Sequence, residues 1–304
     1  SKMIAQPGGK GINSARVIRA LGEEVIASGI VAGNNGAFIK QALDKQGIPH
    51  QMLEIEGESR LCLNIIDEAA GVYTEILEAG PTVREQDCEA LIVLISKLAA
   101  ESSVVTLSGS LPAGAPADLY GKLIDAVHEQ GAVPLLDASG QALVEGINHQ
   151  PFMIKPNEDE LRGLLQLLPY EEAPATGTST STESTAELDE TAQITPFIQQ
   201  IMKQKNLPCA AVTLGEKGAI VGWGDQIYRI SPVQIDAVNP VGSGDSFIAG
   251  IAVGLHRGMN KIETLKLASA CGASNALHQA AGVIDPAEVE RLMGEIEVTP
   301  IASL

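Results

Sequence analysis

The chain has 304 residues, of which 45% are apolar, 31 are glycine and only 3% are aromatic. Its formal net charge of −18 argues against nucleic acid or an anionic membrane surface as a partner, because both are themselves negatively charged. The length and the apolar content suit one large α/β domain or two smaller ones, with a sheet covered by Ala- and Leu-rich helices.

Cysteine and histidine are scattered along the chain. The four cysteines show no CxxC spacing and the five histidines stand singly, so the sequence predicts reduced cysteines and no transition-metal site. Because no apolar run reaches the roughly 18 residues of a membrane span, we expect a cytoplasmic protein.

Hydrophobic periodicity predicts strands alternating with helices along most of the chain. Strand–helix units with short links are typical of a parallel sheet wrapped by helices, so we predict a single, doubly wound α/β domain over residues 1–304. The predicted strands lie at 25–32, 104–107, 133–136, 152–154, 210–214 and 227–235, with a hairpin through Gly222 to Gly224. The predicted helices follow residue 13 and lie at 37–46, 84–100, 116–130, from 158, 194–204, from 248, 261–279 and 286–293.

Two segments interrupt this alternation. Residues 58–67 and 72–77 are both strand-like, and the turn between them predicts a β-hairpin that projects from the sheet as an edge or as the cover of a site. Residues 169–193 hold six acidic and no basic residues and a long Ser/Thr-rich run. Such a segment cannot bury enough apolar surface to order itself, so we predict a mobile insertion within the domain.

Polar residues stand at the ends of successive predicted strands. Ser108 and Asp137 each end a strand, and Lys155 and Asn157 follow the next one. Ligands of open parallel sheets bind beyond the carboxyl ends of the strands, so these residues favour a binding site at that edge of the sheet.

A glycine-rich turn near the start of the chain precedes the first predicted helix. It reads Gly8-Gly9-Lys10-Gly11-Ile12-Asn13. Glycines at the start of a helix bring backbone N–H groups close to a ligand, although the same turn is often purely structural. The spacing fits neither a Walker A loop nor the GxGxxG pattern of dinucleotide-binding folds.

A second glycine-rich turn, residues 239–246, precedes the helix that starts near residue 248. Pro240 disfavours a helix before it, and Gly242 and Gly244 let backbone N–H groups face an anion at the helix start. Asp245 is unexpected beside an anion site. From local chemistry alone it either caps the helix or acts as a general base that takes a proton from an attacking hydroxyl.

With these motifs in order, the chain resembles the ribokinase-like PfkB carbohydrate kinase family over almost its whole length. Within that family, residues 74–81 and the Asn-Pro-Val-Gly-Ser-Gly-Asp form of the second turn are similar to the branch of tagatose-6-phosphate kinases and 1-phosphofructokinases. The matching motifs are Gly8–Asn13, Ser108–Pro112, Asp137–Gly140, Lys155–Glu160, Val212–Gly218 and Asn239–Ser246.

The resemblance implies roles for residues on the sugar side of the site. Asp245 is expected to be the catalytic base, and Gly242, Ser243 and Gly244 are expected to offer N–H groups to the transferring phosphoryl group. The residues expected to bind the phosphosugar are Gly9, Lys10, Asn13, Arg60 and Ser108, with Lys10 and Arg60 on its phosphate.

The resemblance also implies ATP and Mg²⁺ as cofactors. Asn157 and Glu160 are expected to hold Mg²⁺ and the nucleotide phosphates through water, which suits an ion that takes few direct protein ligands. Lys155, Thr213, Gly215 and Gly218 are expected to line the ATP side. The hairpin at about 58–80 is expected to be a lid over the sugar that also makes homodimer contacts.

The implied function is transfer of the γ-phosphoryl group of ATP to a ketohexose phosphate, with tagatose 6-phosphate favoured and fructose 1-phosphate as the alternative. Lys10 and Arg60 disfavour an unphosphorylated sugar or a nucleoside as the acceptor. The family's leading strand, with its Asn-Pro-x-x-Asp motif, has no counterpart before Gly8 in this sequence. Residues that precede Ser1 would explain this, whereas a real loss makes a catalytically impaired homologue that keeps the sugar-phosphate site a second hypothesis.

Overall fold

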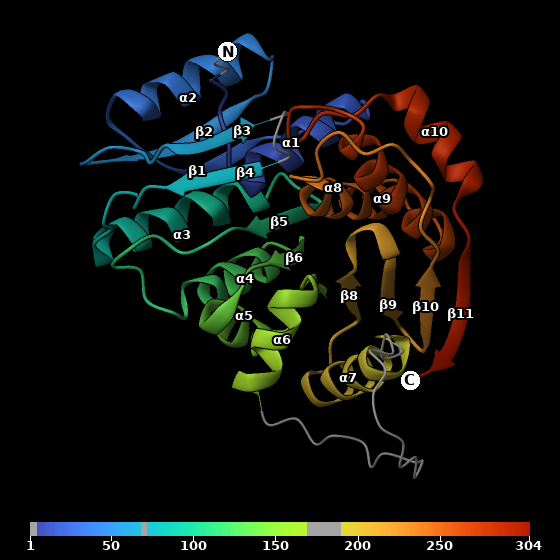
Figure 1. Ribbon diagram of the computed structural model, residues 1–304. Coiled ribbons are helices and arrows are strands. Elements are labelled where there is room, and N and C mark those ends of the chain that lie inside the picture. Colours follow the sequence, from blue (N-terminus) through green and yellow to red (C-terminus); the bar gives the residue numbers. More distant parts are fainter. Residues whose placement is uncertain (1–4, 68–71, 169–189) are drawn as a thin grey trace, which may run out of the picture.

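The computed structural model describes residues 5–67, 72–168 and 190–304 (Figure 1). A seven-stranded sheet runs in the order β11-β10-β9-β8-β7-β6-β5. Its strands are β5 Val104–Ser108, β6 Val133–Asp137, β7 Met153–Ile154, β8 Cys209–Thr213, β9 Ala219–Trp223, β10 Gln226–Ile230 and β11 Val298–Ser303. β5 to β8 pair in parallel, whereas β8 to β11 form an antiparallel meander.

Helices cover both faces of this sheet. One buried core joins the sheet to α3 Glu85–Ala99, α4 Leu119–Glu129, α5 Gly140–Ile147, α6 Glu158–Leu167 and α7 Glu190–Lys205. A second core joins the opposite face to α1 Lys10–Ala20, α8 Ser243–His256, α9 Lys261–Ala276 and α10 Pro286–Glu295. Figure 1 shows α8 and α9 above β8 to β11 and α7 below them.

Glycines bring α8 and α9 into close contact. A Cβ atom added at Gly250 would lie 2.5 Å from Ala268 Cα, and one at Gly254 would lie 2.5 Å from Thr264 Cγ2. At the amino end of α8, a Cβ atom added at Gly272 of α9 would lie 3.2 Å from Ser243 O, so the two helices are close along their whole contact. This contact positions the glycine-rich turn that precedes α8.

The amino-terminal third forms two further two-stranded sheets. Strands β1 Ala27–Ala32 and β2 His50–Ile55 pair in parallel around α2 Gly33–Lys45. Strands β3 Cys62–Asp67 and β4 Val72–Leu77 pair antiparallel, which confirms the predicted hairpin, although its turn at 68–71 lies outside the described residues.

The α/β class and most elements agree with the sequence analysis, with three kinds of difference. β10 ends at Ile230 rather than at residue 235, because Pro232 has no N–H for the ladder and the chain turns away. α7 begins at Glu190, so residues 190–193 belong to a helix, while 169–189 of the predicted insertion lie outside the described residues. Periodicity also failed to identify β2, α5 and β11.

No helix in the described parts of the chain is both long and apolar enough to cross a bilayer.

Candidate active site

The two glycine-rich turns, 226 or more residues apart in sequence, meet through one buried hydrogen bond. Asn13 Nδ2 of α1 donates to Asp245 Oδ2 at the start of α8, at 2.8 Å. Ser14 Oγ donates to the backbone oxygen of the same aspartate at 3.0 Å. Both Asn13 and Asp245 are only 7% exposed. The structure therefore holds the Asp245 carboxylate in one orientation at a helix amino terminus.

Burial is the main influence on the Asp245 carboxyl group. It raises the pKa of Asp245 above the ordinary aspartate value, and the nearby Asp137 carboxylate adds to this. The hydrogen bond from Asn13 and the charges of Lys10 and Lys155 act in the opposite direction without cancelling the rise. A raised pKa makes the carboxylate a better proton acceptor, as a general base requires.

Two lysines converge on a second carboxylate, that of Asp137 at the end of β6. Asp137 is fully buried, and its Oδ1 accepts from Lys10 Nζ at 2.9 Å and lies 3.4 Å from Lys155 Nζ. Lys10 Nζ also reaches Glu160 Oε1 at 3.4 Å. Burial opposes the Lys10 charge, but Asp137, Glu160 and Asp245 together raise the pKa of Lys10. This cluster joins α1, β6, the end of β7 and α6.

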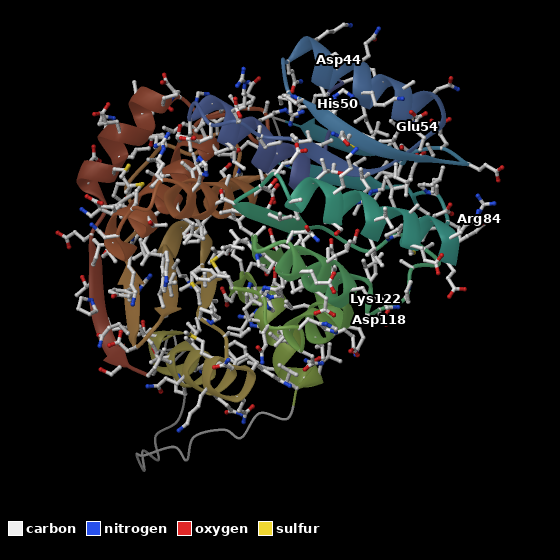
Figure 2. All side chains as sticks on the ribbon, turned by 180° about the vertical axis from the view of Figure 1, so that it is seen from behind. Asp44, His50, Glu54, Arg84, Asp118 and Lys122 are labelled. Atoms are coloured by element: carbon white, nitrogen blue, oxygen red, sulfur yellow. The ribbon has the colours of Figure 1, made fainter. Side chains whose placement is uncertain are left out.

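The cluster differs from the ion pairs on the surface. Asp118 and Lys122, which are labelled in Figure 2, pair at 3.0 Å with side chains 48% and 50% exposed. Such exposed pairs stabilise a fold by only about 0–1 kcal/mol. Asp137 and Lys155, at 0% and 3% exposed, would be costly to bury without partners. Their burial therefore points to a function at the strand ends.

Glycines shape the turn before α8. Gly242 adopts a left-handed conformation with φ of 88°. A Cβ atom at Gly244 would lie 3.1 Å from Lys155 Nζ, so the glycine gives the lysine room to reach the turn. Within the turn, the Ser243 N–H donates to Pro240 O at 3.1 Å.

The residues expected on the ATP side gather at the ends of β7 and β8. Asn157 and Glu160 form a capping box at the start of α6, with reciprocal bonds of 2.8 and 2.9 Å. Asn157 also forms a parallel bridge with Thr213 of β8. Gly215, with φ of 58°, opens the short helix η1 Gly215–Lys217 that follows β8.

Gly218 closes that short helix. Its φ is 86°, and a Cβ atom there would lie 2.2 Å from Ile230 O. The backbone at the end of β10 leaves no room for a side chain here, which is sufficient reason for a glycine at this position.

Three expected sugar-side residues lie outside the charge cluster. Gly9, with φ of 109°, is the residue before α1 and allows Lys10 to begin that helix. Ser108 ends β5 opposite Asp137. Arg60 is exposed just before β3, and the structure gives no contact that joins it to the charge cluster.

The sequence analysis placed Asp137 at the binding edge of the sheet but gave it no chemical role. Its position at the end of a predicted strand was the available signal, but nothing local indicates that two lysines meet there. Asp137 Oδ2 and Ser108 Oγ are also buried without a hydrogen-bond partner in the described part of the chain. Buried polar atoms are rarely left unpaired, so both oxygens are available for a ligand.

A buried carboxylate at a helix amino terminus, a glycine turn and two convergent lysines are groups that a phosphoryl-transfer enzyme can use. Residues 2–288 match the pfkB family carbohydrate kinases, and the chain belongs to that family. This confirms the resemblance and the ribokinase-like fold, and membership implies ATP as the phosphoryl donor.

Known proteins similar to this chain support the family assignment. The tagatose-6-phosphate kinase of Staphylococcus epidermidis is 38% identical over 296 residues, which are 97% of this chain and 89% of that protein. Phosphofructokinase-2 from Escherichia coli in complex with potassium has a TM-score of 0.83 at 23% identity, covering 97% of this chain and 89% of that one. A possible 1-phosphofructokinase from Thermotoga maritima has a TM-score of 0.81 at 23% identity, covering 99% and 90%.

Proposed function

We propose that this protein is an ATP-dependent phosphosugar kinase that converts tagatose 6-phosphate to tagatose 1,6-bisphosphate. The observation that supports this most directly is the buried Asn13–Asp245 hydrogen bond, because it places a basic carboxylate between the two glycine-rich turns. The 38% identity to a tagatose-6-phosphate kinase favours this sugar. Fructose 1-phosphate, the alternative acceptor, differs in the position of its phosphate and in one hydroxyl configuration.

In the proposed reaction Asp245 removes the proton of the acceptor hydroxyl. The resulting oxygen attacks the γ-phosphorus of ATP, the bond from that phosphorus to the bridging oxygen breaks, and ADP leaves. The N–H groups of Gly242 and Gly244 stabilise the charge on the transferring group, and each such donor is typically worth about 2.7–4 kcal/mol. Ser243 contributes a third donor if its bond to Pro240 O opens.

Lys10 and Arg60 are proposed to bind the phosphate of the incoming sugar. Lys10 is paired with Asp137 and, at a longer distance, with Glu160, so a phosphate would replace the Glu160 contact first. Arg60 stands at the base of the β3–β4 hairpin and reaches the phosphate when this lid closes. Asn13, Ser108 and Gly9 orient the sugar beside Asp245.

The oxygen atoms on the ATP side fit a nucleotide that is bound together with Mg²⁺. Asp137 Oδ2 is a buried carboxylate oxygen without a partner, and Glu160 lies close by through Lys10. In the described residues no group of three or more His, Cys, Asp or Glu side chains could hold a metal ion. Asn157 and Glu160 would therefore hold Mg²⁺ through water, and the bound ion would neutralise phosphate charge. Lys155, Thr213, Gly215 and Gly218 line the nucleotide.

The lid hairpin is proposed to contact a second copy of the chain. Leu63 and Ile65 of β3 and Ile76 of β4 share one face, with Leu63 directly opposite Ile76. They are 45%, 52% and 50% exposed, and together with Leu61 they form an apolar patch. A patch of this kind on a kinase lid is suited to burial in a homodimer.

Steady-state assays of ADP release test the function with four acceptors: tagatose 6-phosphate, fructose 1-phosphate, ribose and adenosine. We expect kcat/KM to be highest for tagatose 6-phosphate and turnover of ribose and adenosine to be at background. A preference for an uncharged acceptor would refute the phosphosugar assignment. No turnover of any acceptor, with ATP binding retained, would favour the impaired homologue.

A further inference from the structure

Asn275, in the last turn of α9, is a fully buried amide that uses both ends of its side chain. Its Nδ2 donates to Val241 O at 2.9 Å and to Ser243 Oγ at 3.2 Å. Its Oδ1 accepts from Gly282 N at 2.7 Å. The side chain is 0% exposed. No local pattern explains an asparagine in this Ala-rich helix, so its reason lies in these contacts.

Through Asn275, the three bonds join the glycine turn before α8 to the segment that contains Gly282. A Cβ atom at Gly242 would lie 2.9 Å from Ala281 Cβ and 3.1 Å from Gly282 N. A Cβ atom at Gly282 would in turn lie 2.7 Å from Asn13 Cα. The turn, residues 281–282 and the start of α1 are therefore in direct contact, and Asn275 connects the first two from beneath.

Further backbone bonds make the end of α9 the support of the whole turn. The N–H groups of Val238 and Asn239 both donate to Ala276 O, at 2.7 and 3.1 Å. Asn239 Nδ2 donates to Gln279 O at 2.8 Å. Within this support, Asn275 is the side chain that bonds to residues on both sides of Gly242.

We propose that Asn275 is a positioning residue for phosphoryl transfer: it fixes the Val241–Ser243 turn so that the Gly242 and Gly244 N–H groups face the transferring group. This rests on the proposed kinase function. Asn275 itself lies behind the turn and acts on the reaction only through it. An amide is required because the site needs a donor for Val241 O and an acceptor for Gly282 N at once.

The adjacent Ser274 provides a matched control. It is also fully buried on α9, and its Oγ donates to Glu288 Oε2 at 2.8 Å and accepts from Asp285 N at 3.1 Å. These bonds tie α9 to α10 instead of to the glycine turn. Ser274→Ala thus removes a comparable buried hydrogen-bonding group and leaves the turn intact.

The first experiment compares kcat, KM and melting temperature of Asn275→Ala and Ser274→Ala. We expect Asn275→Ala to lower kcat by about 10- to 100-fold, because small misplacements of catalytic groups have effects of that size. KM for the sugar phosphate should stay within about twofold, since its phosphate is held elsewhere. Ser274→Ala should lower the melting temperature with kcat unchanged. A wild-type kcat for Asn275→Ala, or an equal kcat loss in Ser274→Ala, would overturn the proposal.

Asn275→Asp adds a test that a purely structural role would not pass. The new carboxylate keeps the acceptor for Gly282 N but loses the donor to Val241 O. Protonation restores an O–H donor, so the ratio of variant to wild-type kcat should rise as the pH falls. A ratio that is independent of pH would contradict the donor role, even if Asn275→Ala failed to fold.

Amide hydrogen exchange separates this proposal from the kinase assignment itself. Asn275→Ala should speed exchange in a peptide covering 238–247, whereas Ser274→Ala should speed exchange near 285–288. Both effects are measurable without any turnover. Unchanged exchange at 238–247 in Asn275→Ala would refute the positioning role, whereas inactivity of the wild-type enzyme would refute only the proposed function.

Discussion

The charge cluster at the strand ends and the β3–β4 hairpin have opposite patterns of burial. Asp137 and Lys155 of the cluster and the neighbouring Asp245 are 0%, 3% and 7% exposed although they are charged. In the hairpin, Leu63 and Ile65 are 45% and 52% exposed although they are apolar. Neither pattern stabilises an isolated chain, because buried charges and exposed aliphatic groups both cost free energy. The proposed function gives each region a partner: a small anionic ligand for the cluster and a second copy of the chain for the hairpin.

The largest effect is expected when Asp245, the proposed base beside the cluster, is replaced. Asp245→Asn should lower kcat by about 10²- to 10⁴-fold, the usual contribution of a general base. ATP binding should be largely retained, because the proposed nucleotide contacts lie on α6 and β8. Turnover and ATP affinity are measured on the same preparation. A variant with near-normal turnover would remove Asp245 from the mechanism.

The same variant should not be less stable at neutral pH. The folded-state pKa of Asp245 is raised, so ionisation of this group is less favourable in the folded than in the unfolded chain. The free-energy cost of this ionisation therefore appears as the pH rises above the pKa that the aspartate has in the unfolded chain. The melting temperature of Asp245→Asn relative to wild type should increase from about pH 4 to pH 7. A relative loss over that range would show that the carboxylate is net stabilising.

Of the two basic residues proposed to bind the sugar phosphate, Lys10 lies in the charge cluster and Arg60 lies at the hairpin. Variants of the two residues therefore test the two regions separately. Lys10→Ala and Arg60→Ala should each raise KM for the sugar phosphate about 10- to 100-fold, as expected for a charged hydrogen bond, and leave KM for ATP nearly unchanged. Only Lys10→Ala should also lower the melting temperature, because Asp137 loses its closest partner. Two silent variants would remove the phosphate-binding assignment and leave the kinase assignment standing.

The pH profile should report the burial of the base. Because Asp245 must be deprotonated to accept a proton, kcat/KM should fall about tenfold per pH unit below its pKa. That pKa is raised, so the fall should begin above the ordinary aspartate value of 3.8. A profile that stays flat down to that value would contradict the raised pKa.

The smallest effect on catalysis is expected in the hairpin. Leu63→Asp should weaken self-association at least about tenfold with little change in melting temperature, because the leucine is already half-exposed. Val93→Asp on α3, which is 70% exposed outside the hairpin, is the matched control and should leave self-association unchanged. Light scattering over a range of concentrations gives the oligomeric state. A monomeric wild-type protein would refute the lid dimer.

Sequence by itself determined the elements that carry the site. Helices α1 and α8 follow from apolar periodicity after a glycine turn, and the polar ends of β5, β6 and β7 follow from short apolar runs that stop at Ser108, Asp137 and Lys155. These signals are local, because periodicity and turn chemistry act over a few residues. Short or irregular elements gave too little of such signal, which is why β2, α5 and β11 were missed.

Tertiary structure alone decided which of these residues meet. Lys10 contacts Asp137, 127 positions away, and Asn13 contacts Asp245, 232 positions away, so no local pattern encodes either pair. Asn275 is the clearest case: in sequence it is one polar residue in a helix of small ones, and only the packing of α9 beneath the turn gives its amide three partners. Hydrogen bonds form between groups that topology brings within about 3 Å, and topology depends on the whole chain.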